Sequence, residues 1–369
     1  MKLTQVIQTL EEIAPTRYAE PWDNVGLLVG DLSKDVSSIM LTIDYTAEVA
    51  EEARSANCDL LIAYHPPIWD GLKKIDSTSL IYDAIRRSVA IYSPHTALDI
   101  APGGTNDMLA DAIGLIRPSP LKRASPAVTQ YKLVTFVPED HVEKVASALF
   151  NAGAGKIGDY SSCSFRIKGT GTFFGGEGAN PSAGSKGKLE QVQEIRIETV
   201  LPVSAIDSVI QALKQSHPYE EPAFDLNMLA AHPTGLGMGR IGEMPFTPMA
   251  NILDSIKRAL EIKHLLVAGP ATGNITKAAV CAGACGKLLD DAIAQKAQLY
   301  LTGEMRHHDA LRAASLGMTV VCVLHSNSER AVLKRLSAEL SKRLAAAEPA
   351  APLPAIHLSR KDRDPFSVL

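Results

Sequence analysis

Short apolar segments alternate with amphipathic segments over the first 113 residues, and this alternation restricts the chain to few architectures. Strands are expected at 37–43, 60–63 and 89–93, and helices at 47–55, 80–87 and 107–113. Strands that alternate with helices form largely parallel sheets whose two faces are covered by helices. The sequence therefore predicts an α/β fold.

A second pattern interrupts this alternation. The segment Arg117-Pro118-Ser119-Pro120 indicates a boundary. Between 130 and 227 the expected order is strand, helix, strand, strand, helix, strand, which is typical of a ferredoxin-like α+β module. Gly235, Gly237 and Gly239 are expected to form a flexible return to the main sheet, where strand–helix alternation resumes. The predicted division is 1–126 (α/β lobe one), 127–234 (inserted module), 235–345 (α/β lobe two) and 346–369 (Pro/Ala linker and C-terminal tail).

Composition excludes several classes of protein. The chain has 37 basic and 41 acidic side chains, a net charge of −4, which disfavours a nucleic-acid partner. No segment reaches the roughly 18 consecutive apolar residues of a membrane span. The N-terminal apolar residues have the spacing of an amphipathic helix and not of a signal peptide. Five scattered cysteines fit a reducing compartment. We therefore expect a cytoplasmic protein with no membrane partner.

Histidine and carboxylate residues follow the ends of three predicted strands. His65 follows 60–63, His95 and Asp99 follow 89–93, and His325 and Glu329 follow a strand at 319–323. Active sites of open α/β sheets lie outside the carboxyl ends of the strands. Any one of these histidines alone would more often be a polar rim residue, but their agreement favours a site for zinc, iron or manganese. Asp44, at a fourth strand end, is a weaker candidate because it would also suit the cap of the following helix.

The segment from Thr302 to His308 also follows a predicted strand. Its Glu304 and His308 are candidates for contact with a substrate or for support of a metal ligand. The alternative is an ordinary helix start, with Glu304 near the positive end of the helix dipole. In the inserted module, His217–Pro222 is open to two interpretations, a ligand-binding turn and a turn that only sets strand register.

Several motifs resemble those of the Nif-three-like family, whose members are also described as dinuclear metal centre proteins or type-two homologues of GTP cyclohydrolase one. The motifs are EPWDNVGLLVG at 20–30, YHPPIW at 64–69, SPHTALD at 93–99, TGE at 302–304 and HSNSE at 325–329. The sequence HPYEEP at 217–222 resembles the marker of a PII/CutA-like insert carried by longer members. The resemblance spans nearly the whole chain.

This resemblance implies two related α/β lobes that face one another around a metal cleft, assembled as a toroidal homohexamer. It implies His65, Asp99, His325 and Glu329 as ligands of one or two divalent ions per subunit, with Glu329 as the bridge. Bacterial members carry two adjacent histidines where this chain has Tyr64 and His65. Three explanations stay open: a nearby cation ionises Tyr64, His95 replaces it as a ligand, or the second ion binds weakly.

Two functions follow from these expectations. The first is a metal-dependent hydrolase of a nucleotide, phosphoester or pterin-like small molecule, in which the ion activates water and Glu304 or His308 relays a proton. The second is a non-catalytic metal-bearing scaffold, in which the inserted module binds a regulatory small molecule.

Overall fold

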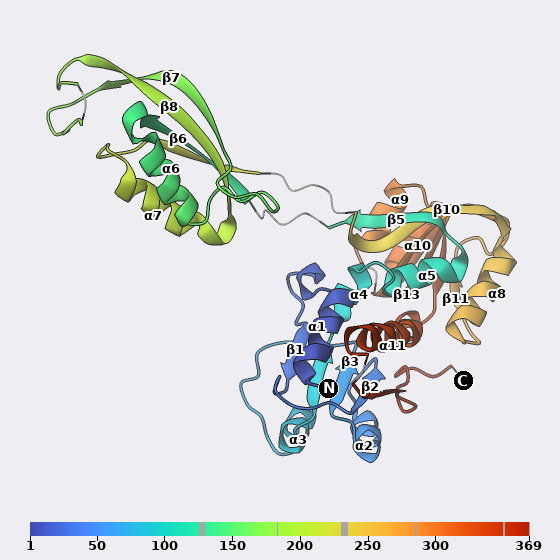
Figure 1. Cartoon of the computed structure of the whole chain (residues 1–369). Coiled ribbons are helices and arrows are strands. Elements are labelled where there is room, and N and C mark those ends of the chain that lie inside the picture. Colours follow the sequence, from blue (N-terminus) through green and yellow to red (C-terminus); the bar gives the residue numbers. More distant parts are fainter. Residues whose placement is uncertain (125–129, 183, 230–234, 285, 350, 369) are drawn as a thin grey trace. The chain divides into compact units, whose positions relative to one another are not determined.

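The computed structural model describes residues 1–124, 130–182, 184–229, 235–284, 286–349 and 351–368. The chain forms two compact units: Met1–Ala124 with Gly235–Leu369, and Ser125–Thr234 (Figure 1). The predicted boundaries at 126/127 and 234/235 involve residues outside the described ranges. The four-part division of the chain stays a prediction.

The first sheet of the larger unit has five strands in the order β1-β4-β3-β2-β15. Their bounds are Gly26–Val29, Ala90–Ser93, Leu60–Ala63, Ser38–Thr42 and Ala355–Leu358. All neighbours are parallel except β1 and β4. Strands β2, β3 and β4 are buried along their whole length, because helices cover both faces of the sheet. The predicted α/β class is confirmed.

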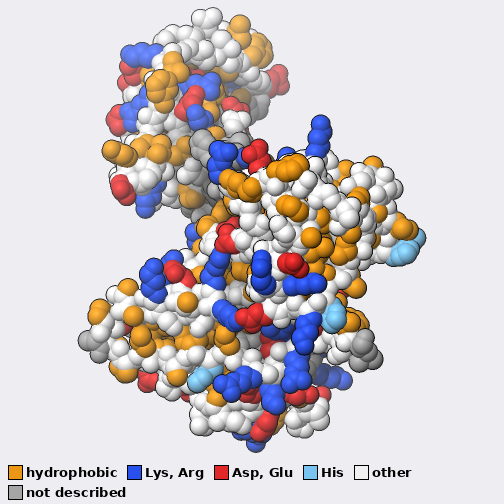
Figure 2. Space-filling view, turned by 90° about the vertical axis from the view of Figure 1, so that its right-hand side faces the viewer, with side chains coloured by type: hydrophobic (Ala, Val, Ile, Leu, Met, Phe, Trp, Pro, Cys, Tyr) orange, Lys and Arg blue, Asp and Glu red, His pale blue; other side chains and the backbone are white. Residues whose placement is uncertain are grey.

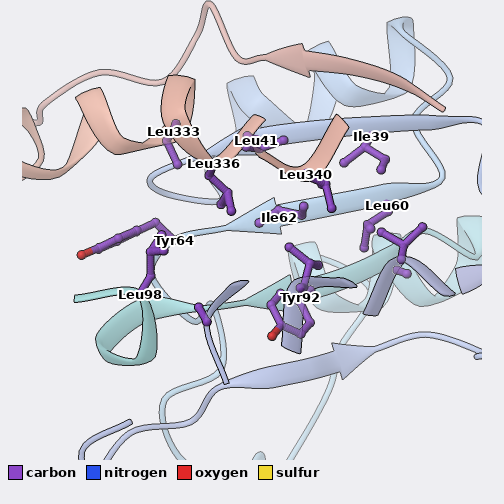
Figure 3. Close-up of a cluster of buried hydrophobic side chains, with 14 of the residues drawn as sticks. Ile39, Leu41, Leu60, Ile62, Tyr64, Tyr92, Leu98, Leu333, Leu336 and Leu340 are labelled. Atoms are coloured by element: carbon purple, nitrogen blue, oxygen red, sulfur yellow. The ribbon is translucent and has the colours of Figure 1, made fainter. Parts of the chain in front are cut away.

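Side chains alternate between the two faces of this first sheet. Ile39 and Leu41 of β2 pack with helices α1 (Leu3–Ile13) and α11 (Asn327–Ala347). The intervening Met40 faces α2 (Ala47–Ser55) and α3 (Leu80–Arg87). Figure 3 shows leucines of α11 packed on the sheet, with Tyr64 at the end of β3. The buried sheet thus fixes the position of the residues that follow its strands.

The second sheet of the same unit has six strands in the order β11-β14-β13-β12-β10-β5. Their bounds are Leu266–Ala268, Thr319–Cys322, Leu299–Glu304, Asn274–Ala284, Gly237–Pro248 and Ile116–Arg123. Strands β12, β13 and β14 are parallel. Helices α5 (Thr105–Ile113) and α8 (Met249–Leu260) pack on one face, and α9 (Leu288–Ala294) and α10 (His307–Ser315) on the other.

Three segments differ from the sequence-based expectations. The proposed boundary at 117–120 lies inside β5, an edge strand where prolines are tolerated because one side of the strand needs no ladder donor. The expected flexible return at Gly237 begins β10. The predicted linker and tail contribute β15, which pairs with β2 in the first sheet. These pairings join distant parts of the chain, so local sequence patterns do not reveal them.

The smaller unit has one antiparallel sheet in the order β7-β8-β6-β9. Its elements are β6 (Gln130–Pro138), α6 (Val142–Asn151), β7 (Ser164–Phe174), β8 (Leu189–Pro202), α7 (Ile206–Ser216) and β9 (Phe224–Met228). Helices α6 and α7 pack on one face of the sheet. This βαββαβ order is that of a ferredoxin-like module, as the sequence pattern predicts.

Surface charges of both signs lie side by side. Figure 2 shows a face on which Lys and Arg side chains alternate with Asp and Glu. On α11, Arg330, Lys334 and Arg335 each form an ion pair, with Asp362 at 3.2 Å, Glu261 at 2.7 Å and Asp111 at 2.7 Å. Among the described residues, no helix is both long enough and apolar enough to cross a bilayer.

Candidate metal centre

Three segments of the larger unit place polar side chains at the carboxyl ends of its parallel strands. His65 lies two residues beyond β3, His95 begins α4 (His95–Ile100) just beyond β4, and His325 lies between β14 and α11. A backbone hydrogen bond links the first two segments, because His95 N donates to the carbonyl of Tyr64 at 3.2 Å. His95 and Leu324 have positive φ angles of 21° and 72°. Such conformations cluster at functional sites.

A cluster of three potential ligands joins the two sheets of this unit. One ligand atom from each of His65, His325 and Glu329 lies within 4.8 Å of the others. The Nε2 atoms of His65 and His325 are 3.3 and 3.4 Å from the two carboxylate oxygens of Glu329. The structure thus brings together residues that are about 260 positions apart in the sequence. A divalent ion could bind at this point.

Each histidine of this cluster is held by a carboxylate through its other ring nitrogen. His65 Nδ1 is 2.9 Å from Asp44 Oδ1, and His325 Nδ1 is 2.6 Å from Glu304 Oε1. If Nδ1 donates to the carboxylate, Nε2 carries the lone pair that a metal ion requires. Carboxylate partners of this kind orient histidine ligands in metal sites and raise their basicity.

The carboxylate of Glu329 fits a cation better than it fits the protein around it. Its side chain is 3% exposed, and Oε2 accepts no hydrogen bond from the described residues. A buried carboxylate oxygen without a donor is costly unless a positive charge satisfies it. Gly283 leaves the space open, because a Cβ atom there would lie 2.9 Å from Glu329 Oε1. The donor set therefore fits a divalent transition metal.

The charges around His65 also favour a bound cation. Burial disfavours its charged form, but the nearby carboxylates of Asp44 and Glu329 outweigh burial and raise the pKa of His65 to about 10. The two carboxylates therefore stabilise positive charge at this point. A metal ion can supply that charge once the proton leaves.

A second group, Tyr64, His95 and Asp99, adjoins this cluster. The ring of His65 is 5.3 Å from the rings of both Tyr64 and His95. The Tyr64 hydroxyl donates to Asp99 Oδ1 and lies 3.1 Å from Thr105 Oγ1. Burial, followed by the charge of Asp99, raises the pKa of Tyr64 well above its usual range. This favours a neutral phenol over an ionised ligand.

Asp99 already accepts a hydrogen bond within the protein, from the Tyr64 hydroxyl. Burial raises its pKa to about 6, against the hydrogen bond from Tyr64, which lowers it. His95 Nδ1 is 2.8 Å from Asp23 Oδ1, so its Nε2 is left for another partner. The roles of Tyr64, His95 and Asp99 as metal ligands stay predictions.

Glu304 and His308 occupy different surroundings. Glu304 is hydrogen-bonded to His325 and orients its ring, in addition to any part that Glu304 has in proton transfer. His308 is exposed on α10, and the ring contact that it makes is with His307. Their roles in proton transfer also stay predictions.

Sequence reasoning missed one supporting residue, Asp23, and ranked another, Asp44, as a weaker candidate. Asp23 lies in the motif at 20–30 but has no sequence signal for its contact with His95. Asp44 does not cap α2, because Thr46 is the N-cap and accepts from Val49 N; Asp44 holds His65 instead. The position of Asp44 directly after a buried strand is the signal that points to the site.

Comparisons with known proteins agree over nearly the whole length. The family described as Duf34/NIF3 (NGG1p interacting factor 3) matches residues 1–359. A Bacillus subtilis (strain 168) protein named GTP cyclohydrolase 1 type 2 homolog is 39% identical over 327 residues, covering 86% of each chain. A Mycobacterium tuberculosis protein of the same name is 37% identical, covering 84% of this chain and 83% of the relative.

Solved structures show the same likeness. A Bacillus cereus protein described as related to NIF3 is 34% identical, with a TM-score of 0.68 and coverage of 100% of this chain and 99% of that one. A Staphylococcus aureus protein is 27% identical, with a TM-score of 0.78 and the same coverage.

Proposed function

The chain belongs to the Duf34/NIF3 family, and from this premise we propose that it is a divalent-metal-dependent hydrolase of a nucleotide, phosphoester or pterin-like small molecule. The observation that carries the proposal is the convergence of His65, His325 and Glu329 within 4.8 Å. A bound zinc, iron or manganese ion would supply Lewis acidity and lower the pKa of a coordinated water.

Each residue in and around the cluster would have a defined role in binding the ion. His65 and His325 present Nε2, and Glu329 presents the buried oxygen that lacks a donor. Asp44 and Glu304 keep the two imidazoles in the required orientation. A second, weaker ion would use His95 and Asp99 with Glu329 as the bridge, while Tyr64 stays a neutral donor to Asp99.

Proton transfer would fall to Glu304 or His308. The support for Glu304 is its place next to His325 and its side chain, which is 51% exposed and therefore open to solvent and substrate. His308 is the second candidate, on the exposed face of α10. A group of either kind close to the reacting atoms typically contributes to hydrolysis as a general acid or base.

The name shared by the bacterial relatives supports a nucleotide or pterin-like substrate. We do not extend it to the opening of the GTP ring. We further propose, from the resemblance to the family, a toroidal homohexamer and, from composition and net charge, a cytoplasmic protein without a nucleic-acid partner. Both the assembly and the location belong to the proposal.

A second candidate function is a metal-bearing regulatory scaffold. The observation that favours it is a cavity of about 770 Å³ in the smaller unit, a volume that suits a small molecule. Its lining includes Phe136, Phe173, Glu194, Arg196 and Tyr219. The Tyr219 hydroxyl donates to Glu194 at 2.7 Å inside this lining. In this case the metal would serve structure, and the module would bind the regulatory ligand.

Metal analysis combined with turnover separates these functions. The full-length protein, purified without chelator, is loaded with zinc or manganese and assayed on a panel of nucleotides, phosphoesters and pterins. We expect hydrolysis of at least one substrate, and loss of both turnover and bound metal in His325→Ala. His264→Ala is the control, because His264 is exposed and outside the cluster. A folded, metal-loaded protein without turnover on the panel would favour the scaffold.

A further inference from the structure

Both tryptophans of the chain lie beside the candidate metal centre. The sequence contains only Trp22 and Trp69, and their side chains are 63% and 52% exposed. The Trp22 ring is 5.9 Å from the His95 ring, and the Trp69 ring is 5.2 Å from it. Tryptophan is rarely left so exposed without a partner, because its large apolar surface gains much from burial.

The two indoles are more than half exposed and stand nearly at right angles to the His95 ring. Trp22 meets the His95 ring at 75° and Trp69 meets it at 87°, both in edge contacts. Trp69 is also 6.4 Å from the ring of His65. One of the indoles thus borders a histidine of the ligand cluster, and both border the histidine next to it.

Three consecutive residues keep the indoles in place. Trp22 contacts His95 directly, and Asp23 binds His95 Nδ1 at 2.8 Å. Asn24 Nδ2 donates to the carbonyl of Ile68 at 2.6 Å, next to Trp69. The loop of Trp22 is therefore fixed both to the metal centre and to the loop of Trp69. Aromatic walls held in this way lose little conformational entropy when a ligand binds.

We infer that Trp22 and Trp69 bind the planar heteroaromatic ring of the substrate, by stacking on one or both indole faces. The inference rests on the proposed function, because it assumes that the ion holds the polar, reacting part of the same molecule. Stacking on tryptophan recognises any flat π-system and needs no particular pattern of hydrogen bonds. The substrate is then a nucleotide or a pterin, and a simple sugar phosphate binds poorly.

The same two tryptophans provide the measurement. Excitation at about 300 nm reports on both indoles, and stacking should quench their emission. The zinc-loaded, full-length protein is titrated with guanosine 5′-monophosphate and, separately, with ribose 5-phosphate, which lacks the ring. We expect the nucleotide to quench the emission and to bind at least about tenfold more tightly than the sugar phosphate.

Substitutions of the two tryptophans test whether their side chains cause the preference for the nucleotide over the sugar phosphate. Trp22→Ala and Trp69→Ala should each weaken nucleotide binding about tenfold by calorimetry and leave ribose 5-phosphate binding unchanged. Trp22→Phe and Trp69→Phe should restore most of the affinity. Phe246→Ala, which removes an aromatic side chain that is 74% exposed elsewhere in the same unit, is the control and should change neither affinity. Circular dichroism confirms that each variant is folded.

Three results would overturn the inference. The first is equal affinity for the nucleotide and the sugar phosphate, and the second is a nucleotide affinity that the alanine variants leave intact. The third is an emission spectrum typical of buried indoles that acrylamide does not quench, which would show that the two rings are covered and cannot stack on a ligand. Failure of the proposed function looks different: the ring preference would persist, together with its dependence on Trp22 and Trp69, while no substrate is hydrolysed.

Discussion

The two halves of the candidate metal centre satisfy their buried charges in different ways. In the first half, Glu329 has a buried oxygen without a hydrogen-bond donor, and His65 and His325 approach it with their Nε2 atoms. In the second half, the buried Asp99 accepts a hydrogen bond from Tyr64. A buried carboxylate oxygen without a donor gains more from a cation than a carboxylate that already has a hydrogen-bond partner. We therefore expect tight binding of one ion in the first half and weak binding of another in the second.

The largest effect is expected from Glu329→Gln, which removes a ligand and its charge with little change of shape. Metal affinity should fall by more than about 100-fold, because even the loss of an outer partner costs about 10–100-fold. Calorimetric titration of the metal-free protein with zinc measures the change. Asp99→Asn is the matched variant in the second half and should leave the affinity for the first ion nearly unchanged. Equal losses in the two variants would contradict the proposed difference between the halves.

Removal of the orienting carboxylates should have the next largest effect. Asp44→Ala and Glu304→Ala should each lower zinc affinity about 10–100-fold, because His65 and His325 lose the partners that fix their rings. Asp23→Ala, which frees His95 in the second half, should change the affinity for the first ion far less. The same zinc titration tests all three variants. A larger loss for Asp23→Ala than for the other two would place the tight site in the second half.

The pH dependence of metal binding should follow His65. Its pKa is raised to about 10 in the metal-free protein, so the ring is protonated at pH 7 and must lose that proton to bind the ion. Zinc affinity should therefore rise about tenfold per pH unit between pH 6 and 8. Calorimetry in buffers of different ionisation enthalpy should detect about one released proton. Affinity that does not change with pH would show that the ion does not displace a proton from His65.

The smallest effect is expected from Tyr64→His, which tests the second half directly. A histidine at this position would supply a new ligand and free Asp99 from the phenol, so a second equivalent of metal should bind, more weakly than the first. Tyr64→Phe also frees Asp99 but adds no ligand, and it should leave the stoichiometry unchanged. Metal analysis after dialysis against buffered zinc measures the difference. A full second equivalent of tightly bound metal in the unaltered protein would contradict the expected weak binding in the second half.

Local patterns predicted the parts of the fold that depend on neighbours in sequence. The spacing of Leu3, Val6 and Leu10 predicted α1, and these residues are buried in its interface with the first sheet. The four apolar residues at 60–63 predicted β3. The edge strands β5 and β15 escaped prediction, because prolines and short length mask strands whose stability comes from pairing with distant segments.

The prediction of the site was also limited by contacts between residues that are distant in the sequence. Strand ends predicted His65, His325 and Glu329 as candidates for one metal site. No local pattern indicates that Glu304 binds His325 or that Asp23 binds His95, because these contacts span 21 and 72 positions of the chain. The unsatisfied oxygen of Glu329 also depends on three-dimensional packing, and so does the meeting of the two tryptophans at His95.

A crystal structure of the zinc-loaded protein, with an anomalous difference map collected at the zinc edge, tests most directly where the tight metal site lies. We expect a strong peak bonded to Nε2 of His65, Nε2 of His325 and the carboxylate of Glu329, with a weaker peak or none beside Asp99. A dominant peak beside Asp99 and His95, or a metal-loaded protein with no peak at Glu329, would contradict it.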